Sequence, residues 1–232
     1  MIKFLLIFLM FIFFSSSAYA PLVKVDVKSV CQFDIKSFNI RESGLPTISM
    51  EIYNSGSVVF RFRVFMDALS KTWSKEYVLK PGEIVSLNLS FVPAETNRIK
   101  IFYCSDVFEK TFYVSRPSLI SSNDFRVESI RSYGDFLIFD VYSNLTKNLF
   151  ILASDYPEGW VFEYGNGYVK KGKNLIKVHN KPVGDEEVEI GFYLVSEDGF
   201  YTYQKAKIDK PKGLRFLFYY ILDTIRLRLQ NI

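Results

Sequence analysis

The chain has 232 residues, 29 Lys and Arg against 25 Asp and Glu, and 17% aromatic residues. A hydrophobic share of 49% excludes a disordered chain, and a net charge of only +4 argues against a nucleic-acid partner. One His and two Cys exclude a His-rich metal site, a zinc ribbon and a dense disulfide scaffold, so we expect no cofactor and no metal.

The first twenty residues have the order of a secretory signal peptide. Lys3 gives a positive start, residues 4–14 are an unbroken apolar run, and small residues end at Ala20. This run is short for a spanning helix, which needs about 20 apolar residues. We therefore expect an extracytoplasmic protein, secreted or at the cell surface. The alternative is an uncleaved N-terminal anchor.

Export changes the expectation for four further residues. Cys31 and Cys104 can form a disulfide in an oxidising compartment, which would stabilise the fold by about 4 kcal/mol. The alternative is two separate buried thiols. Asn88 and Asn144 each begin an Asn-x-Ser/Thr triplet, so both are candidate glycosylation sites.

The chain aligns with itself, without a gap, at an offset of 89 residues. The matching segments are 48–54 with 137–143, 60–64 with 149–153, 87–89 with 176–178 and 99–103 with 188–192. Each alternates apolar and polar residues, which is typical of strands. A unit of about 90 residues with several short strands has the size of an antiparallel sandwich. The repeat therefore predicts an all-β fold of two tandem antiparallel β-sandwiches.

The predicted organisation has five parts. They are a signal peptide (1–20), a first sandwich (21–115), a linker (116–123), a second sandwich (124–208) and a basic amphipathic helix (209–232). Strand alternation also predicts that Asn88 and His179 face solvent, and that Cys104 lies near the rim of its sheet.

Short motifs in both repeats resemble known extracellular modules. Asn54-Ser55-Gly56 followed by Leu79-Lys80-Pro81-Gly82-Glu83 resembles the CARDB-type (cell-adhesion-related) immunoglobulin-like (Ig-like) domain of bacterial and archaeal envelope proteins. Pro157-Glu158-Gly159-Trp160 with Lys171-Gly172-Lys173-Asn174 resembles the Ig-like modules appended to secreted prokaryotic glycosidases. The resemblance implies that both sandwiches are Ig-like and that the protein is an extracytoplasmic, non-catalytic module of an adhesion or envelope protein. It implies no catalytic residues.

The C-terminal segment changes to a helical period. One face of the predicted helix is apolar and contains Leu214, Leu217, Phe218, Ile221, Leu222, Ile225 and Leu229. A narrow polar strip lies opposite and contains Arg215, Tyr219, Asp223, Arg226 and Gln230. Arg228 falls inside the apolar arc, where its long stem would snorkel. An apolar surface this broad is not expected to stay in water.

Three arrangements would cover this helix. It can pack on its own second sandwich, lie in a membrane interface, or dock on a partner chain. Residues 209–232 carry five basic and two acidic side chains, which favours surface binding over ordinary core. We therefore rank intermolecular use, through Leu217, Phe218, Ile221, Leu222, Ile225, Arg226 and Arg228, slightly ahead of self-docking.

An aromatic row offers a candidate ligand site. Trp160, Phe162 and Tyr164 share one predicted strand face, and Tyr168 lies across the predicted Gly165–Gly167 turn. Exposed rings in a row can stack on sugars, whereas buried rings would be sandwich core.

The predicted function is a non-catalytic structural or adhesive component of the cell envelope, held to an envelope protein or membrane surface by the C-terminal helix. The first alternative is a carbohydrate-binding module that uses the row around Trp160. The second is a hydrolase of unrecognised type, for which a pocket of carboxylates around His179 would be needed.

Overall fold

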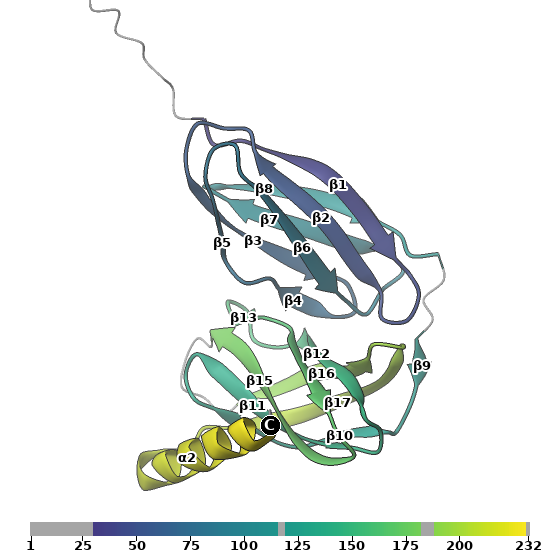
Figure 1. The fold of residues 1–232 in the computed structure, drawn as a ribbon, viewed down its shortest axis with the longest axis vertical. Helices are drawn as coiled ribbons and strands as arrows, with labels where there is room; N and C mark the ends of the chain where they lie inside the picture. The colour runs from purple at the N-terminus through teal and green to yellow at the C-terminus, as the bar shows by residue number, and fades with distance from the viewer. Residues whose placement is uncertain (1–29, 116–118, 182–187, 231–232) are drawn as a thin grey trace, which may run out of the picture.

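The computed structural model describes residues 30–115, 119–181 and 188–230, and Figure 1 shows their arrangement. Nearly all of the regular structure within these residues is β, with one C-terminal helix, so the all-β prediction is confirmed. Strands β1–β8 form what we call the first β unit, and β9–β17 form the second β unit. The predicted signal peptide, 1–20, lies outside the described residues.

The first β unit consists of two facing sheets. Its strands are β1 (Phe33–Arg41), β2 (Thr47–Asn54), β3 (Phe60–Asp67), β4 (Lys71–Trp73), β5 (Tyr77–Leu79), β6 (Ile84–Ser90), β7 (Asn97–Tyr103) and β8 (Asp106–Phe112). One sheet has the order β1-β2-β6, and the other has the order β4-β3-β7-β8 with β5 beside β3. Alternate residues such as Ile48, Phe62 and Ile101 are buried between the sheets, as period-2 patterning requires.

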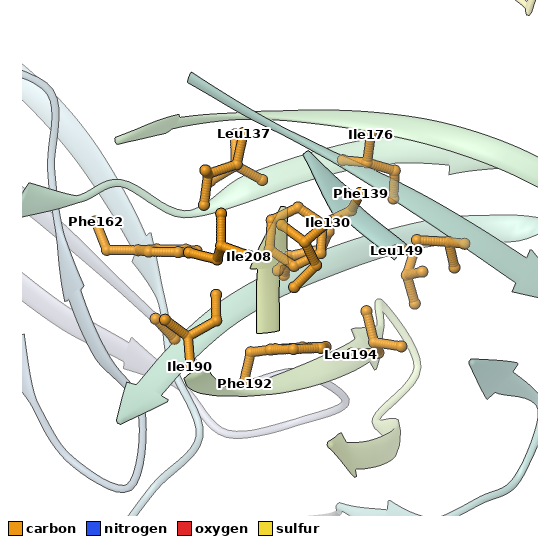
Figure 2. Packing of buried hydrophobic residues seen from close by; sticks show 14 of the residues in the cluster. Ile130, Leu137, Phe139, Leu149, Phe162, Ile176, Ile190, Phe192, Leu194 and Ile208 are labelled. Atoms are coloured by element: carbon orange, nitrogen blue, oxygen red, sulfur yellow. The ribbon is translucent and has the colours of Figure 1, made fainter. Parts of the chain in front are cut away.

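The second β unit is one sheet that folds over on itself. Its strands are β9 (Ile120–Ser121), β10 (Phe125–Ser132), β11 (Phe136–Ser143), β12 (Lys147–Asp155), β13 (Val161–Phe162), β14 (Gly165–Val169), β15 (Gly172–Lys181), β16 (Glu189–Ser196) and β17 (Phe200–Asp209). The order is β13-β15-β11-β10-β17-β16-β12-β14, with β9 beside β17. A short parallel pairing of β10 with β17 joins the two layers. In Figure 2, Leu137 and Phe139 of one layer face Ile190 and Phe192 of the other.

The sequence repeat corresponds to equivalent strands. β2 and β11 have the same length and begin at Thr47 and Phe136, which preserves the offset of 89 residues. The order β1-β2-β6 in the first β unit matches β10-β11-β15 in the second. Paired positions correspond as well, because Ser49 pairs with Asn88 and Ile138 pairs with Lys177. The two units are therefore copies of one strand plan.

The connection between the units is partly strand. Ile120 and Ser121, within the predicted 116–123 linker, form β9 and pair in parallel with Phe200 and Tyr201 of β17. The chain is thus attached to the second β unit soon after it leaves the first.

The two β units also contact each other through side chains. Leu45 and Val92 of the first pack on Leu152 and Val195 of the second, and all four are buried. The Leu45 amide donates a hydrogen bond of 3.1 Å to the carbonyl oxygen of Glu197. This small apolar cluster couples the units.

Cys31 and Cys104 form the predicted disulfide, with 6.8 Å between their Cα atoms. It joins the segment before β1 to the turn between β7 and β8, and so ties together the two sheets of the first β unit. Cys104 therefore lies at the end of its sheet. Because disulfides persist in oxidising compartments, this bond indicates an extracytoplasmic environment.

Candidate functional site

Helix α2 (Gly213–Gln230) packs across the outer face of the second β unit, next to β11 and β15 (Figure 1). Its orientation is the reverse of an ordinary amphipathic helix. Asp223 is 2% exposed, whereas Leu214 is 86% exposed. At about 100° per residue these two positions lie about 180° apart on the helix. The helix therefore docks through its polar strip and presents its apolar arc to solvent.

A buried polar cluster holds the docked side. The Asp223 carboxylate accepts hydrogen bonds from Arg131 Nε (2.7 Å) and Nη2 (3.0 Å), and from the Tyr133 hydroxyl (2.6 Å). Arg131 Nη1 also donates to Ser129 Oγ at 2.6 Å. Bidentate pairing fixes the guanidinium and carboxylate planes together, so the cluster sets the rotation of α2 about its own axis.

Two further polar contacts lie along the same strip. Arg226 Nη1 is 3.5 Å from Asp140 Oδ2, and the Leu175 amide donates to Gln230 Oε1 at 2.7 Å. The first reaches the middle of β11 and the second reaches β15. Together with the Asp223 cluster they attach the C-terminal half of the helix at three points.

Aromatic and apolar contacts fill the space around the polar cluster. Tyr133 packs edge-on against Phe216 and Tyr220, with ring centroids 5.6 Å apart in each pair. Ile138 and Leu175 are buried beneath the helix and pack with Leu227. The docked face therefore has a conventional apolar component, although a charged group stands at its centre.

The surroundings of Asp223 change the ionisation of its partners. Burial disfavours the charged guanidinium of Arg131, but the hydrogen bonds and negative charge of Asp223 outweigh burial and raise its pKa. Burial and the neighbouring carboxylate both raise the pKa of Tyr133 above its ordinary value. Arg131 therefore stays charged and Tyr133 stays a hydrogen-bond donor at neutral pH.

The predicted attachment residues divide between the two faces. Five predicted apolar residues are exposed, which are Leu217, Phe218, Ile221, Leu222 and Ile225. Arg228 is exposed as well. Arg226 belongs instead to the docked side, because it is half-buried against Asp140. Helix α2 therefore combines self-docking with a free apolar arc, because it docks by the opposite face.

Two pockets flank α2 where it crosses the sheet. One, of about 220 Å³, is lined by residues that include Lys177, Tyr220 and Arg228. The other, of about 450 Å³, is lined by residues that include Tyr168 and Lys170. Both pockets thus carry exposed cations beside the helix.

The aromatic row is not an exposed sugar platform, so that prediction is corrected. Trp160 is 3% exposed and Phe162 is fully buried, and both belong to the core of the second β unit. Tyr164 is half-buried and packs against the core of the first β unit. Tyr168 is 56% exposed but lies beside α2, away from the buried rings. The large rings bury more apolar area as core than an exposed row would allow.

The predicted turn at residues 165–167 is also wrong, because these residues begin strand β14. A Cβ at Gly165 would clash with Val178, and one at Gly167 would lie 3.4 Å from Ile176. Gly165 lets β14 pack closely on β15, which is a different use of glycine from a tight turn.

The remaining predicted positions are surface ones. Asn88 and Asn144 are both exposed, as glycan acceptors must be, and glycosylation of either stays a prediction. His179 is exposed on β15 and lines neither of the pockets beside α2.

Sequence reasoning missed Arg131 and Tyr133, the partners of Asp223. The one signal was Asp223 itself, the only carboxylate in α2 and directly opposite the apolar arc. A lone acidic residue at the centre of a helix face predicts a partner, but it does not say which of the chain's many cations provides it.

Within the part of the chain that the structure describes, no helix is both long and apolar enough to cross a membrane. No family model and no curated protein matches the chain. Similar solved structures include a transglutaminase of red sea bream, the N-terminal periplasmic domain of ScsB from Proteus mirabilis, and the YadV chaperone.

The structural similarities are distant. The chain is 12% identical to the transglutaminase with a TM-score of 0.29, and the match covers 78% of this chain but only 31% of that one. For ScsB the values are 10% identity, a TM-score of 0.31, and coverage of 74% and 91%. For YadV they are 9%, 0.25, and 69% and 91%. TM-scores this low carry no argument about function.

Proposed function

We propose that this protein is a non-catalytic, extracytoplasmic module of the cell envelope, with a structural or adhesive role, that attaches through the exposed face of α2. One observation carries the proposal: the helix is docked by its polar strip, and its apolar arc faces solvent. Phe218 and Leu229 are each 64% exposed, and Ile221 and Ile225 are about half exposed. A contiguous apolar surface of this kind marks an interaction site.

The docking cluster supports attachment over accidental exposure. An ordinary surface helix turns its apolar side inward because burial of that side stabilises the fold. Here a bidentate ion pair of Arg131 with Asp223 holds the opposite side inward. Such a buried pair contributes little net stability but specifies one orientation, and this orientation leaves the arc free.

The proposed compartment agrees with the Cys31–Cys104 disulfide. Secretion by a signal peptide at 1–20, a CARDB-type Ig-like identity for the β units, and glycans at Asn88 and Asn144 are further parts of the proposal.

A pair of matched isoleucines tests the attachment surface. Ile221 in α2 and Ile84 in the first β unit are 49% and 57% exposed, so glutamate is tolerated by the fold at either position. We expect Ile221→Glu to release the protein from the envelope fraction of fractionated cells, while Ile84→Glu stays with wild type. Equal fractionation of all three proteins would contradict attachment through α2.

A further inference from the structure

Helix α2 carries exposed cations but no exposed carboxylate. Its only acidic residue, Asp223, is buried in the pair with Arg131. Its exposed side carries Arg228 within the apolar arc, whereas Arg215, on the polar strip, pairs with Asp209 at 2.8 Å. We propose that the surface that covers this arc is a lipid bilayer with anionic phosphate headgroups, and that α2 lies flat in its interface. This inference rests on the proposed function, because it names what α2 attaches to.

The shape of the surface suits a bilayer. The seven exposed apolar side chains span an arc about 140° wide along a helix about 27 Å long. An apolar arc of this width can be buried along its whole length when the helix lies flat in a bilayer interface. Figure 1 places α2 at the end of the molecule away from the first β unit. A bilayer beneath α2 would therefore leave the first β unit pointing away from it.

The cations lie where headgroups would be. Arg228 falls within the arc at the C-terminal end of α2, and its stem can cross the apolar surface while the guanidinium reaches a phosphate. Lys177 on β15 lines the same 220 Å³ pocket as Arg228 and Tyr220. Lysine and arginine beside an apolar helix face are typical of helices that lie in the interface of anionic membranes.

Arg228 and Lys177 form what we call the basic margin of the apolar arc, and a second group of residues continues it past the end of α2. Lys170 and the exposed Tyr168 line the 450 Å³ pocket together with Leu227 and Gln230 of the helix. Tyrosine is enriched at the boundary between acyl chains and water, because its ring is apolar and its hydroxyl is polar. The side chains around both pockets thus complement an anionic, phosphate-bearing interface.

The charges disfavour a second copy as the occupant. If two α2 arcs packed together, Arg228 of each copy would meet a surface that offers cations and no exposed helix carboxylate. Self-association would therefore bury like charges, which costs free energy, whereas an anionic bilayer neutralises them.

Vesicle flotation of the full chain tests the inference. The probes are vesicles of phosphatidylcholine alone and of phosphatidylcholine mixed with phosphatidylglycerol. We expect strong binding to the anionic vesicles, weaker binding to the neutral ones, and a loss of binding as salt is raised. Phe218→Glu with Ile221→Glu should abolish binding to both, because it places charge in the apolar arc.

A charge variant with a matched control tests the basic margin. Arg228→Gln with Lys177→Gln should weaken binding to anionic vesicles roughly fivefold for each cation removed, and leave neutral binding unchanged. Lys75→Gln with Lys80→Gln removes two exposed cations from the first β unit. It should leave binding to anionic vesicles and binding to neutral vesicles unchanged.

Three results would overturn the inference. Equal binding to neutral and anionic vesicles would remove the headgroup preference. A dimer in solution that Ile221→Glu converts to a monomer would assign the arc to a second copy. Attachment to the cell envelope in an α2-dependent way, without binding to either vesicle, would assign it to a protein and leave the proposed function standing. If attachment to the envelope also fails, the proposed function falls with the inference.

Discussion

The two β units share a strand plan but treat the same outer sheet face in opposite ways. In the first β unit this face carries Ser49, Ser86 and Asn88, which are exposed. At the equivalent positions the second β unit has Ile138, Leu175 and Lys177. Ile138 and Leu175 are buried under α2. A change from serine to a branched apolar residue at two positions thus separates a solvated face from a helix-covered one.

The units also differ in what reinforces them. The first has a disulfide between its two sheets, and the second has a helix held by an ion pair. A covalent tie constrains the unfolded chain wherever it is placed. The polar cluster of Asp223, Arg131 and Tyr133, which we call the clamp, holds α2 only if these groups meet in the correct geometry. In exchange, it leaves one face of the helix free for attachment.

The largest expected effect comes from breaking the clamp. Asp223→Ala leaves Arg131 buried without its hydrogen-bonded carboxylate, and the remaining carboxylate, Asp140, lies 3.8 Å away. This should lower the free energy of unfolding of the docked helix by about 3–5 kcal/mol. Urea denaturation and amide hydrogen exchange in α2 would measure the change. Arg131→Met with Asp223→Leu should recover most of the loss, because no charge is then left unpaired. Wild-type protection of α2 in Asp223→Ala would contradict the clamp.

Removing the disulfide should have a smaller effect, located in the first β unit. Cys31→Ser with Cys104→Ser should destabilise that unit by about 2–4 kcal/mol, since its unfolded chain gains freedom. Hydrogen exchange should show the loss in β1 and in β7 and β8, while α2 keeps its protection. A loss concentrated in the second β unit would show that the two reinforcements are not separate.

Positions 86 and 175 are equivalent in the two β units, so exchanging their residue types compares the two outer faces directly. Leu175→Ser makes the covered face resemble the solvated one and should cost about 2–3 kcal/mol, because a buried leucine is lost beneath α2. Ser86→Leu, at an exposed site, should change stability by less than about 0.5 kcal/mol. Thermal denaturation of both variants tests the pair, and similar costs at the two positions would refute the contrast between the faces.

The smallest effect is confined to alkaline pH. Because the pKa of Tyr133 is raised in the fold by burial and by Asp223, folded protein holds this proton longer than unfolded protein does. The stabilisation is therefore complete below pH of about 10, the ordinary tyrosine pKa, and is lost as the pH rises through the raised value. Tyr133→Phe lacks this titration, so its stability should fall less steeply above that pH. Parallel curves of stability against pH for wild type and Tyr133→Phe would contradict this prediction.

Much of the fold was predictable because strands leave a period-2 pattern that does not depend on distant residues. The 89-residue repeat located β2 and β11 correctly, and the apolar periodicity located α2. The disulfide was predictable because only two cysteines exist to pair. The burial of the aromatic row around Trp160 was not predictable. An alternating pattern shows which residues share a strand face, but not whether that face is covered.

The sequence by itself determined the strands, the repeat, the helix and which of its faces is apolar. Only the tertiary structure decided which face of α2 docks and which stays free. That choice depends on Arg131 and Tyr133, about 90 residues before Asp223 in the chain. Hydrophobic periodicity ranks faces by apolar area, and here a buried bidentate ion pair, supported by aromatic packing, turns the less apolar face inward.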